Sequence, residues 1–257
     1  MITIFRKIRQ KLIADKRASK YLLYAIGEIL LVVIGILIAL QINNTNELSK
    51  QRNLELHYLK NIKTDLILNI KHLENYIDAR ETAINSANEV IAHYEGKPIK
   101  DLKAFSRHTV NIYTWRKFFQ INNTFQELMN SGNLALISND SIKDILLNME
   151  SLYKLMKDGE AHFRYDSEVL LYEPSYNMMD MNPIVQNYMY YASKGAVGDN
   201  RELSKKEFQN MLKDIKQKNG FVMAVYQFSE MNVQFNEMKN MCEQLIVLID
   251  KELVNND

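Results

Sequence analysis

The chain has 257 residues, of which three are proline, eight glycine and one cysteine, and its formal net charge is +1. Few helix-breaking residues, together with abundant Leu, Ile, Met, Lys, Glu and Asn, predict an all-α fold. The single cysteine excludes an intrachain disulfide and any site built from several thiolates. Charge is unevenly distributed: residues 1–20 hold seven bases and one acid, which leaves 25 bases and 30 acids in residues 21–257. This mildly acidic remainder argues against a nucleic-acid partner, because nucleic-acid binding depends on clustered bases.

The first predicted element is the basic segment at residues 1–20. Apolar residues such as Phe5, Ile8 and Leu12 recur at helical spacing, which predicts an amphipathic helix lying on an anionic membrane surface. A plain cluster of charges with no ordered helix is the alternative. The residues expected to anchor the segment at the membrane interface are Arg6, Lys7, Arg9, Lys11, Lys16, Arg17 and Lys20.

Residues 21–42, YLLYAIGEILLVVIGILIALQI, are long and apolar enough to cross a bilayer and include a single acidic residue, Glu28. A spanning helix needs about 20 mostly apolar residues. A secretory signal peptide is the competing interpretation, but its apolar region is usually about 7–15 residues long and is followed by a small-x-small cleavage site, which is missing here. The segment is therefore predicted to be an uncleaved transmembrane helix, with Tyr21 and Tyr24 at the headgroup boundary.

Orientation follows from the same charge bias. Lys and Arg close to a spanning helix are retained on the cytoplasmic side. The N-terminus is therefore predicted to be cytoplasmic and the region after the helix to lie outside the inner membrane, which in a Gram-negative bacterium means the periplasm.

The acid within the spanning helix shares a face with small residues. Ala25, Gly35 and Ala39 lie three residues before, seven after and eleven after Glu28, so the 3.6-residue period places all four together. Small residues allow close helix approach, and a protonated carboxyl can donate a hydrogen bond across the contact. The pattern predicts a homo-oligomer. The alternatives are an ion or proton path lined by Glu28, or a carboxyl that reaches toward Lys20 or water.

Residues 5–47, FRKIRQKLIADKRASKYLLYAIGEILLVVIGILIALQINNTNE, resemble the N-terminal signature of an uncharacterised family of single-pass membrane proteins from Bacteroidota, a domain of unknown function. Glu28, Gly35, Gln41, Asn43 and Asn44 fall on its pattern. The pattern has Trp at the position of Thr45, so an aromatic anchor is lacking there. Residues 125–139, FQELMNSGNLALISN, are similar to the family's second motif. The resemblance implies topology and host type but no activity.

A long stalk helix is predicted at residues 43–95. Apolar residues follow a stripe of three-and-four spacing, and neither proline nor glycine occurs between Glu47 and Tyr94. Gly96 and Pro98 are expected to end it. The members of the stripe are Leu59, Ile62, Leu66, Ile70, Leu73, Ile77, Ile84, Ile91 and Tyr94.

Residues 96–257 are predicted to form an antiparallel helical bundle that packs on the stalk. Two capping boxes, Thr124 with Glu127 and Ser204 with Glu207, predict helix starts, the second opening a helix at 205–217. Gly132 should end the first of these helices, and Asn139 should cap a longer one that runs to about residue 172. Residues 173–182, with a proline near the start and Pro183 just after, are expected to form a bend before a last helix at about 221–253.

The search for chemistry finds no catalytic, cofactor-binding or metal-binding motif. Glu89 and His93 could supply two metal ligands, but an exposed pair four residues apart on a helix is the preferred interpretation. Cys242 is expected to be a buried small apolar residue. The aromatic cluster at 188–191, YMYY, could be a contact surface, and a core face is preferred.

Three kinds of function remain. The first is a membrane-anchored, oligomeric interaction or scaffold protein without catalytic activity, whose partners are the lipid bilayer, further copies of the chain and an unidentified membrane or periplasmic protein. The second is a periplasmic sensor or signal-transmitting accessory with a ligand-binding helical domain. The third is an ion-conducting or force-coupled assembly that uses Glu28.

Overall fold

The computed structural model describes residues 18–254, with side chains from Leu22 onward, and divides the chain into two compact units at residues 1–57 and 58–257. The described residues are helical with no strand, so the predicted all-α fold is confirmed. Helix α2, Ala18–Tyr94, is 77 residues long and passes through both units. It ends at the predicted signal: Gly96 has φ +105°, and the Lys97 amide donates to the Ala92 carbonyl at 3.0 Å.

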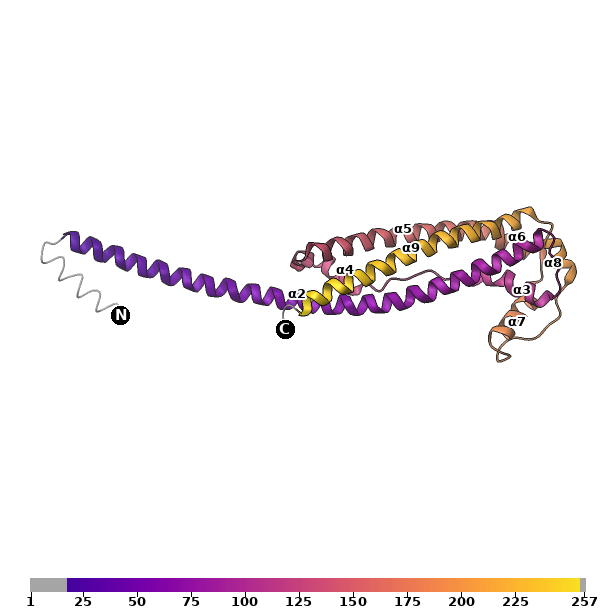
Figure 1. Cartoon of the computed structure of the whole chain (residues 1–257), viewed down its shortest axis with the longest axis horizontal. Coiled ribbons are helices and arrows are strands. Elements are labelled where there is room, and N and C mark those ends of the chain that lie inside the picture. The colour runs from indigo at the N-terminus through magenta and orange to yellow at the C-terminus, as the bar shows by residue number, and fades with distance from the viewer. Residues whose placement is uncertain (1–17, 255–257) are drawn as a thin grey trace. The chain divides into compact units, whose positions relative to one another are not determined.

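Three long helices form the second unit. Residues 58–94 of α2 lie beside α5, Asp140–Ser167, and α9, Ile215–Val254 (Figure 1). Helix α9 is antiparallel to both others, whereas α2 and α5 run in the same direction. The parallel pair is possible because the chain returns along the bundle between them, through the extended residues 115–122 (Figure 1).

Short helices close the two ends of this bundle. The end where α2 stops carries α3, Leu102–Asn111, with η1, Ile112–Thr114, and then α6, Glu173–Met178, α7, Met181–Ala192, and α8, Lys205–Met211 (Figure 1). The other end carries α4, Asn123–Asn130, and η2, Asn133–Leu136. A π-helical turn, η3, Glu168–Tyr172, joins α5 to α6.

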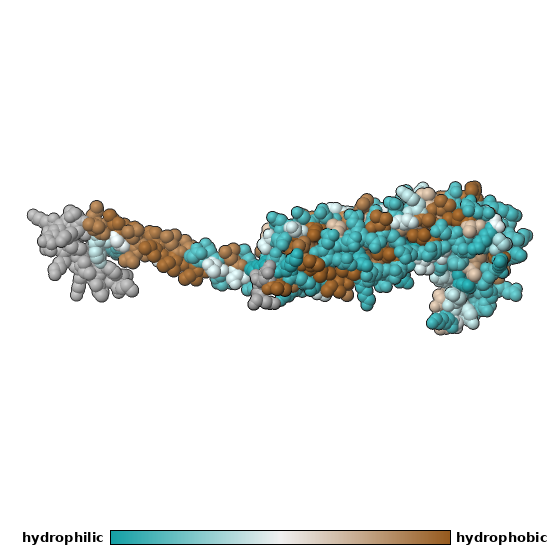
Figure 2. Space-filling model, viewed as in Figure 1, coloured by the Kyte–Doolittle hydropathy of each residue, from teal (hydrophilic) through white to brown (hydrophobic). Residues whose placement is uncertain are grey.

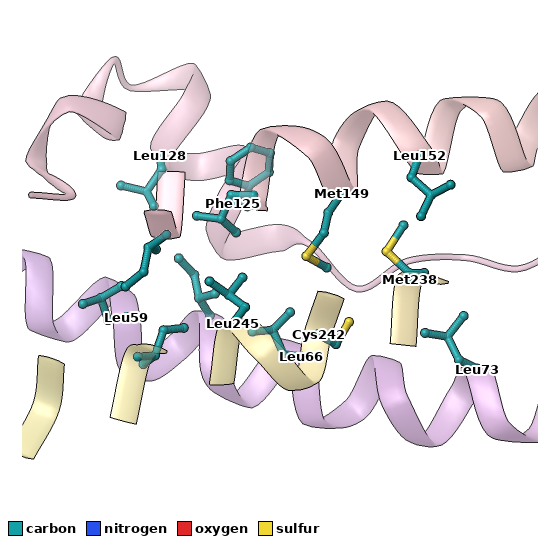
Figure 3. Packing of buried hydrophobic residues seen from close by; sticks show 14 of the residues in the cluster. Leu59, Leu66, Leu73, Phe125, Leu128, Met149, Leu152, Met238, Cys242 and Leu245 are labelled. Atoms are coloured by element: carbon teal, nitrogen blue, oxygen red, sulfur yellow. The ribbon is translucent and has the colours of Figure 1, made fainter. Parts of the chain in front are cut away.

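Apolar side chains fill the bundle as two clusters along its length. In the first, Leu66 of α2, Met149 of α5 and Leu245 of α9 point toward one another (Figure 3). In the second, Phe163 of α5 contacts Phe228 of α9, with ring centroids 4.4 Å apart, beside Ala83 of α2. The predicted stripe on α2 therefore contributes side chains to both clusters.

Several predicted helix ends are confirmed. The Asn139 side chain accepts from the Ile142 amide at the start of α5, and Ser204 accepts from the Glu207 amide at the start of α8. Gly132, with φ +72°, follows the end of α4. The carboxylate of Glu207 does not return to Ser204: it accepts from the Asp180 amide.

The predicted capping box at Thr124 is wrong. Helix α4 already includes Asn123, and Thr124 donates through its amide and its hydroxyl to Asp65 of α2, at 3.3 and 2.9 Å. Glu127 likewise faces α2, where it accepts from the Tyr58 hydroxyl at 3.1 Å. Thr124 and Glu127, which were expected to cap α4, therefore hold it against α2.

Two other boundaries differ from the prediction. Residues 173–178 continue as α6 and do not bend, because Pro174 lies in the first turn of that helix, where its missing amide is not needed. The break falls at Met179 and Asp180 instead, and Asp180 caps α7 through the Asn182 amide. Near the end of the chain, α8 stops at Met211 and α9 begins at Ile215, since the Asp214 carboxylate accepts from the Lys216 amide.

Candidate functional site

The first site to consider is the apolar part of α2. One helix among the described residues is long and apolar enough to cross a membrane, and none of its most apolar 18-residue window, of mean hydropathy 2.7, is buried. Figure 2 shows this part of α2 as a continuous apolar surface. The core helix of a soluble protein would be covered by other elements. This exposure therefore distinguishes the segment from such a core helix.

The four residues predicted to associate fall on this helix. Ala25 and Glu28 are partly exposed, and Ala39 is exposed. A Cβ added at Gly35 would meet no atom within 4 Å. Regular helix from Ala18 onward places the four on one face, at about 100° per residue. Association through them stays a prediction.

The predicted interfacial residues lie mostly beyond the described part of the chain. Arg6, Lys7, Arg9, Lys11, Lys16 and Arg17 fall outside the described residues. Lys20 and Tyr21 lie in α2, but their side chains are not described, and Tyr24 is partly exposed.

The second site is the return segment, residues 115–122, which is held in the bundle by side chains rather than by backbone pairing. Asn69 of α2 donates to the Ile121 carbonyl at 2.7 Å and accepts from the Ile121 amide at 2.8 Å. The Tyr76 hydroxyl donates to the Lys117 carbonyl at 2.6 Å. An extended chain inside a helical bundle has no ladder partner, so these bonds satisfy backbone groups that would otherwise be buried unpaired.

A buried charged cluster lies at the centre of this arrangement. The Glu160 carboxylate of α5, fully buried, accepts from the Phe118 amide at 2.7 Å and from Lys157 Nζ at 2.8 Å. Arg80 of α2 is 3% exposed and approaches Glu160 to 3.6 Å. Its guanidinium also lies over the rings of Phe228 and Phe235, at 4.8 and 5.3 Å from their centroids. Desolvation lowers the pKa of Arg80 to about 10, so the group is still a cation at neutral pH.

A cavity of about 540 Å³ opens beside Arg80 in the second unit. Ligand sites usually measure about 300–1,000 Å³ and combine aromatic walls with a few polar groups. The lining residues are His72, Asn75, Tyr76, Ala79, Arg80, Ala83, Asn111, Thr114, Trp115, Arg116, Tyr188 and Phe228.

The residues that the sequence singled out for chemistry lie apart from this cavity. Glu89 and His93 are four residues apart on α2, but His93 is buried, with Nδ1 2.7 Å from the Lys97 carbonyl, and Glu89 is only partly exposed, so the expectation of an exposed pair is wrong. Cys242 is buried in the first apolar cluster as predicted, and burial raises the pKa of its thiol to about 12.

The preference for a core face at residues 188–191 is wrong for most of the cluster. Tyr191 is 62% exposed and Tyr190 is 40% exposed, because α7 turns its buried side, with Ile184 and Asn187, toward the bundle. Only Tyr188 packs inward, where it lines the cavity. The Arg107 guanidinium lies 4.0 Å from the Tyr191 ring centroid.

The sequence search missed Arg80 and Glu160, although a signal was present. The apolar stripe of α2 has no member between Ile77 and Ile84. Arg80 occupies that position, three residues after Ile77 and four before Ile84. Glu160 occupies the equivalent place in α5, between the buried Met156 and Phe163. A charge at an apolar position on each of two long helices indicates a buried ion pair.

The chain was compared with known proteins. No curated protein and no solved structure matches it. The model of a family of unknown function, DUF6090, matches residues 28–177, which is more than half of the chain. The matched range begins at Glu28 in the apolar part of α2 and includes Arg80, the return segment and Glu160. The chain therefore belongs to the family of unknown function DUF6090.

Proposed function

We propose that the chain is a single-pass inner-membrane protein that self-associates through α2 and presents its helical bundle in the periplasm as an interaction or scaffold domain without catalytic activity. The observation that carries the proposal is the exposed apolar helix, which continues without a break into a well-packed bundle. A bilayer would cover the apolar surface that the protein itself leaves open.

The cytoplasmic side is assigned to the N-terminus from the seven bases in residues 1–20. The resemblance of residues 5–47 to proteins of Bacteroidota supports a Gram-negative host and therefore a periplasmic bundle. The proposed partners are the bilayer, further copies of the chain and an unidentified membrane or periplasmic protein.

We expect a reporter that is active only in the periplasm to give signal when fused after residue 257 in a Gram-negative host. The same reporter fused before residue 1 of the full chain should be silent, because the positive charges hold that side in the cytoplasm. Reporter activity and immunoblots of both fusions measure the outcome. A silent C-terminal fusion that is stably expressed would overturn the topology.

We expect Gly35→Leu to weaken self-association, because a bulky side chain on the face of Glu28 separates the helices. Gly27→Leu is the matched control: it adds the same side chain about 100° away from Glu28, and neither glycine has an atom within 4 Å of an added Cβ. Crosslinking yields in native membranes compare the two variants. Equal yields would remove this face from the proposal.

A second candidate function is a ligand-responsive accessory in the same topology. The cavity beside Arg80 favours it, because a scaffold needs no cavity of about 540 Å³ lined by aromatic rings and two guanidinium groups.

A further inference from the structure

The cavity beside Arg80 has walls of two chemical kinds. One kind is aromatic and comes from four separate elements: Tyr76 of α2, Trp115 of the return segment, Tyr188 of α7 and Phe228 of α9. The other kind is polar, with the cations Arg80 and Arg116 and no carboxylate among the lining residues. Such walls complement a ligand that is apolar at one end and negatively charged at the other.

Arg80 has hydrogen-bonding capacity that the protein does not use. A guanidinium carries five N–H donors. Nη2 donates to the Arg116 carbonyl at 3.3 Å, while Nε and Nη1 are buried and donate to no acceptor. Buried donors without an acceptor are costly, which is why native structures seldom keep them.

Glu160 does not neutralise the surrounding charge. Its two carboxylate oxygens already accept from the Phe118 amide and from Lys157, and its closest approach to Arg80 is 3.6 Å, longer than a charge-assisted hydrogen bond. One carboxylate therefore faces two cations, and the cluster retains excess positive charge next to the cavity.

We propose that this cavity binds a small organic anion, with its carboxylate drawn to Arg80 and Arg116 and its apolar or aromatic body packed against Trp115, Tyr188 and Phe228. The anion balances the excess charge, and the donors of Arg80 that lack an acceptor gain one once the guanidinium turns toward the cavity. The bound anion contacts α2, α7 and α9 at once. All of the lining residues belong to the second unit, so this inference does not depend on membrane insertion or on self-association.

The test uses the full chain in detergent and its own fluorescence, since Trp115 is the only tryptophan and lines the cavity. Hexanoate and phenylacetate are the probes, and their neutral amides, hexanamide and phenylacetamide, are the matched controls. With excitation at the tryptophan edge, we expect a saturable change in Trp115 emission with both acids and a dissociation constant about tenfold or more weaker for the amides. The same titration curve for acids and amides, or no saturable change with any of the four, would overturn the proposal.

Variants locate the binding. Arg116→Gln should raise the dissociation constant of phenylacetate by about tenfold, whereas Arg164→Gln, which removes an equal charge from an exposed site on α5, should leave it unchanged. The double variant Arg80→Met, Glu160→Gln should abolish binding. Circular dichroism must first show that this variant has the helical content of the unaltered protein. Unaltered binding in both cavity variants, or an equal loss in Arg164→Gln, would contradict the assignment.

Discussion

Replacing Glu160 with alanine should destabilise the second unit by about 3–5 kcal/mol, the effect expected when one member of a buried ion pair is removed. The variant leaves the Phe118 amide without its acceptor and Arg80 without its nearest counter-ion, and both groups are buried. Lys157 also loses its carboxylate partner. Because three groups depend on one carboxylate, the loss should exceed that of any single exposed ion pair in the bundle.

Urea unfolding followed by Trp115 fluorescence measures the effect, since this side chain packs against Phe163 with ring centroids 5.1 Å apart. Glu168→Ala is the control: Glu168 lies eight residues after Glu160 and pairs with Arg164, four residues before it. Both side chains of this pair are more than half exposed, so the cost should stay below about 1 kcal/mol. Equal midpoints for the two variants would show that the buried carboxylate does not stabilise the bundle.

A second variant separates charge from hydrogen bonding. Glu160→Gln keeps an acceptor for the Phe118 amide and loses the charge that faces Arg80 and Lys157. Its cost should fall between those of Glu160→Ala and Glu168→Ala. Arg80→Met added to Glu160→Gln should cost less than the sum of the two single changes, because each single change leaves a partner unpaired and the double change removes both charges.

The helices could be predicted from the sequence, because helical periodicity and capping are local. The stripe from Leu59 to Tyr94 lies within α2, and Asn139, Gly132 and Ser204 mark helix ends where expected. Each of these signals depends on residues within about one helical turn, so one stretch of sequence contains all the information needed.

The return segment could not be predicted in the same way. Its partner Asn69 is 52 residues away from Ile121, and Glu160 is 42 residues away from Phe118. Hydrogen bonds between a side chain and a distant backbone leave no periodic pattern in either segment. The same cause explains the failed capping box at Thr124, where a locally convincing motif was used for a contact with Asp65, 59 residues away.

The cavity was missed for a related reason. Its lining comes from α2, α3, η1, the return segment, α7 and α9, which are far apart in the sequence. Arg80 and Glu160 could be recognised as charged residues within apolar stripes. A charge in a stripe identifies neither its partner nor the cavity beside it. The aromatic cluster on α7 was assigned to the wrong environment because one short helix can turn either face to a core that the sequence does not locate.

Phe118→Ala should cost about 3–5 kcal/mol of unfolding free energy, in the range for removal of a buried phenylalanine ring. Phe118 is fully buried and its ring lies edge-on to Tyr76, 5.6 Å between centroids, and 5.8 Å from Phe235 of α9. The ring therefore fixes an extended segment between two helices that would otherwise be separated by an unfilled space.

Phe119→Ala supplies a control at the next position of the same segment. Its ring is 68% exposed, and Lys157 Nζ lies 4.8 Å from the ring centroid, a cation–π contact of a kind worth about 0.5–1 kcal/mol at exposed sites. Urea unfolding should therefore show a loss of unfolding free energy that is several-fold larger for Phe118→Ala than for Phe119→Ala, although the substitutions are chemically identical. If the two losses are equal, Phe118 is not packed in the core, and the return segment lies on the surface of the bundle. A large loss of unfolding free energy for Phe118→Ala alone would show that Phe118 anchors the return segment. Trp115 and Arg116, which line the cavity, precede Phe118 by three and two residues, so the same anchor holds them in place.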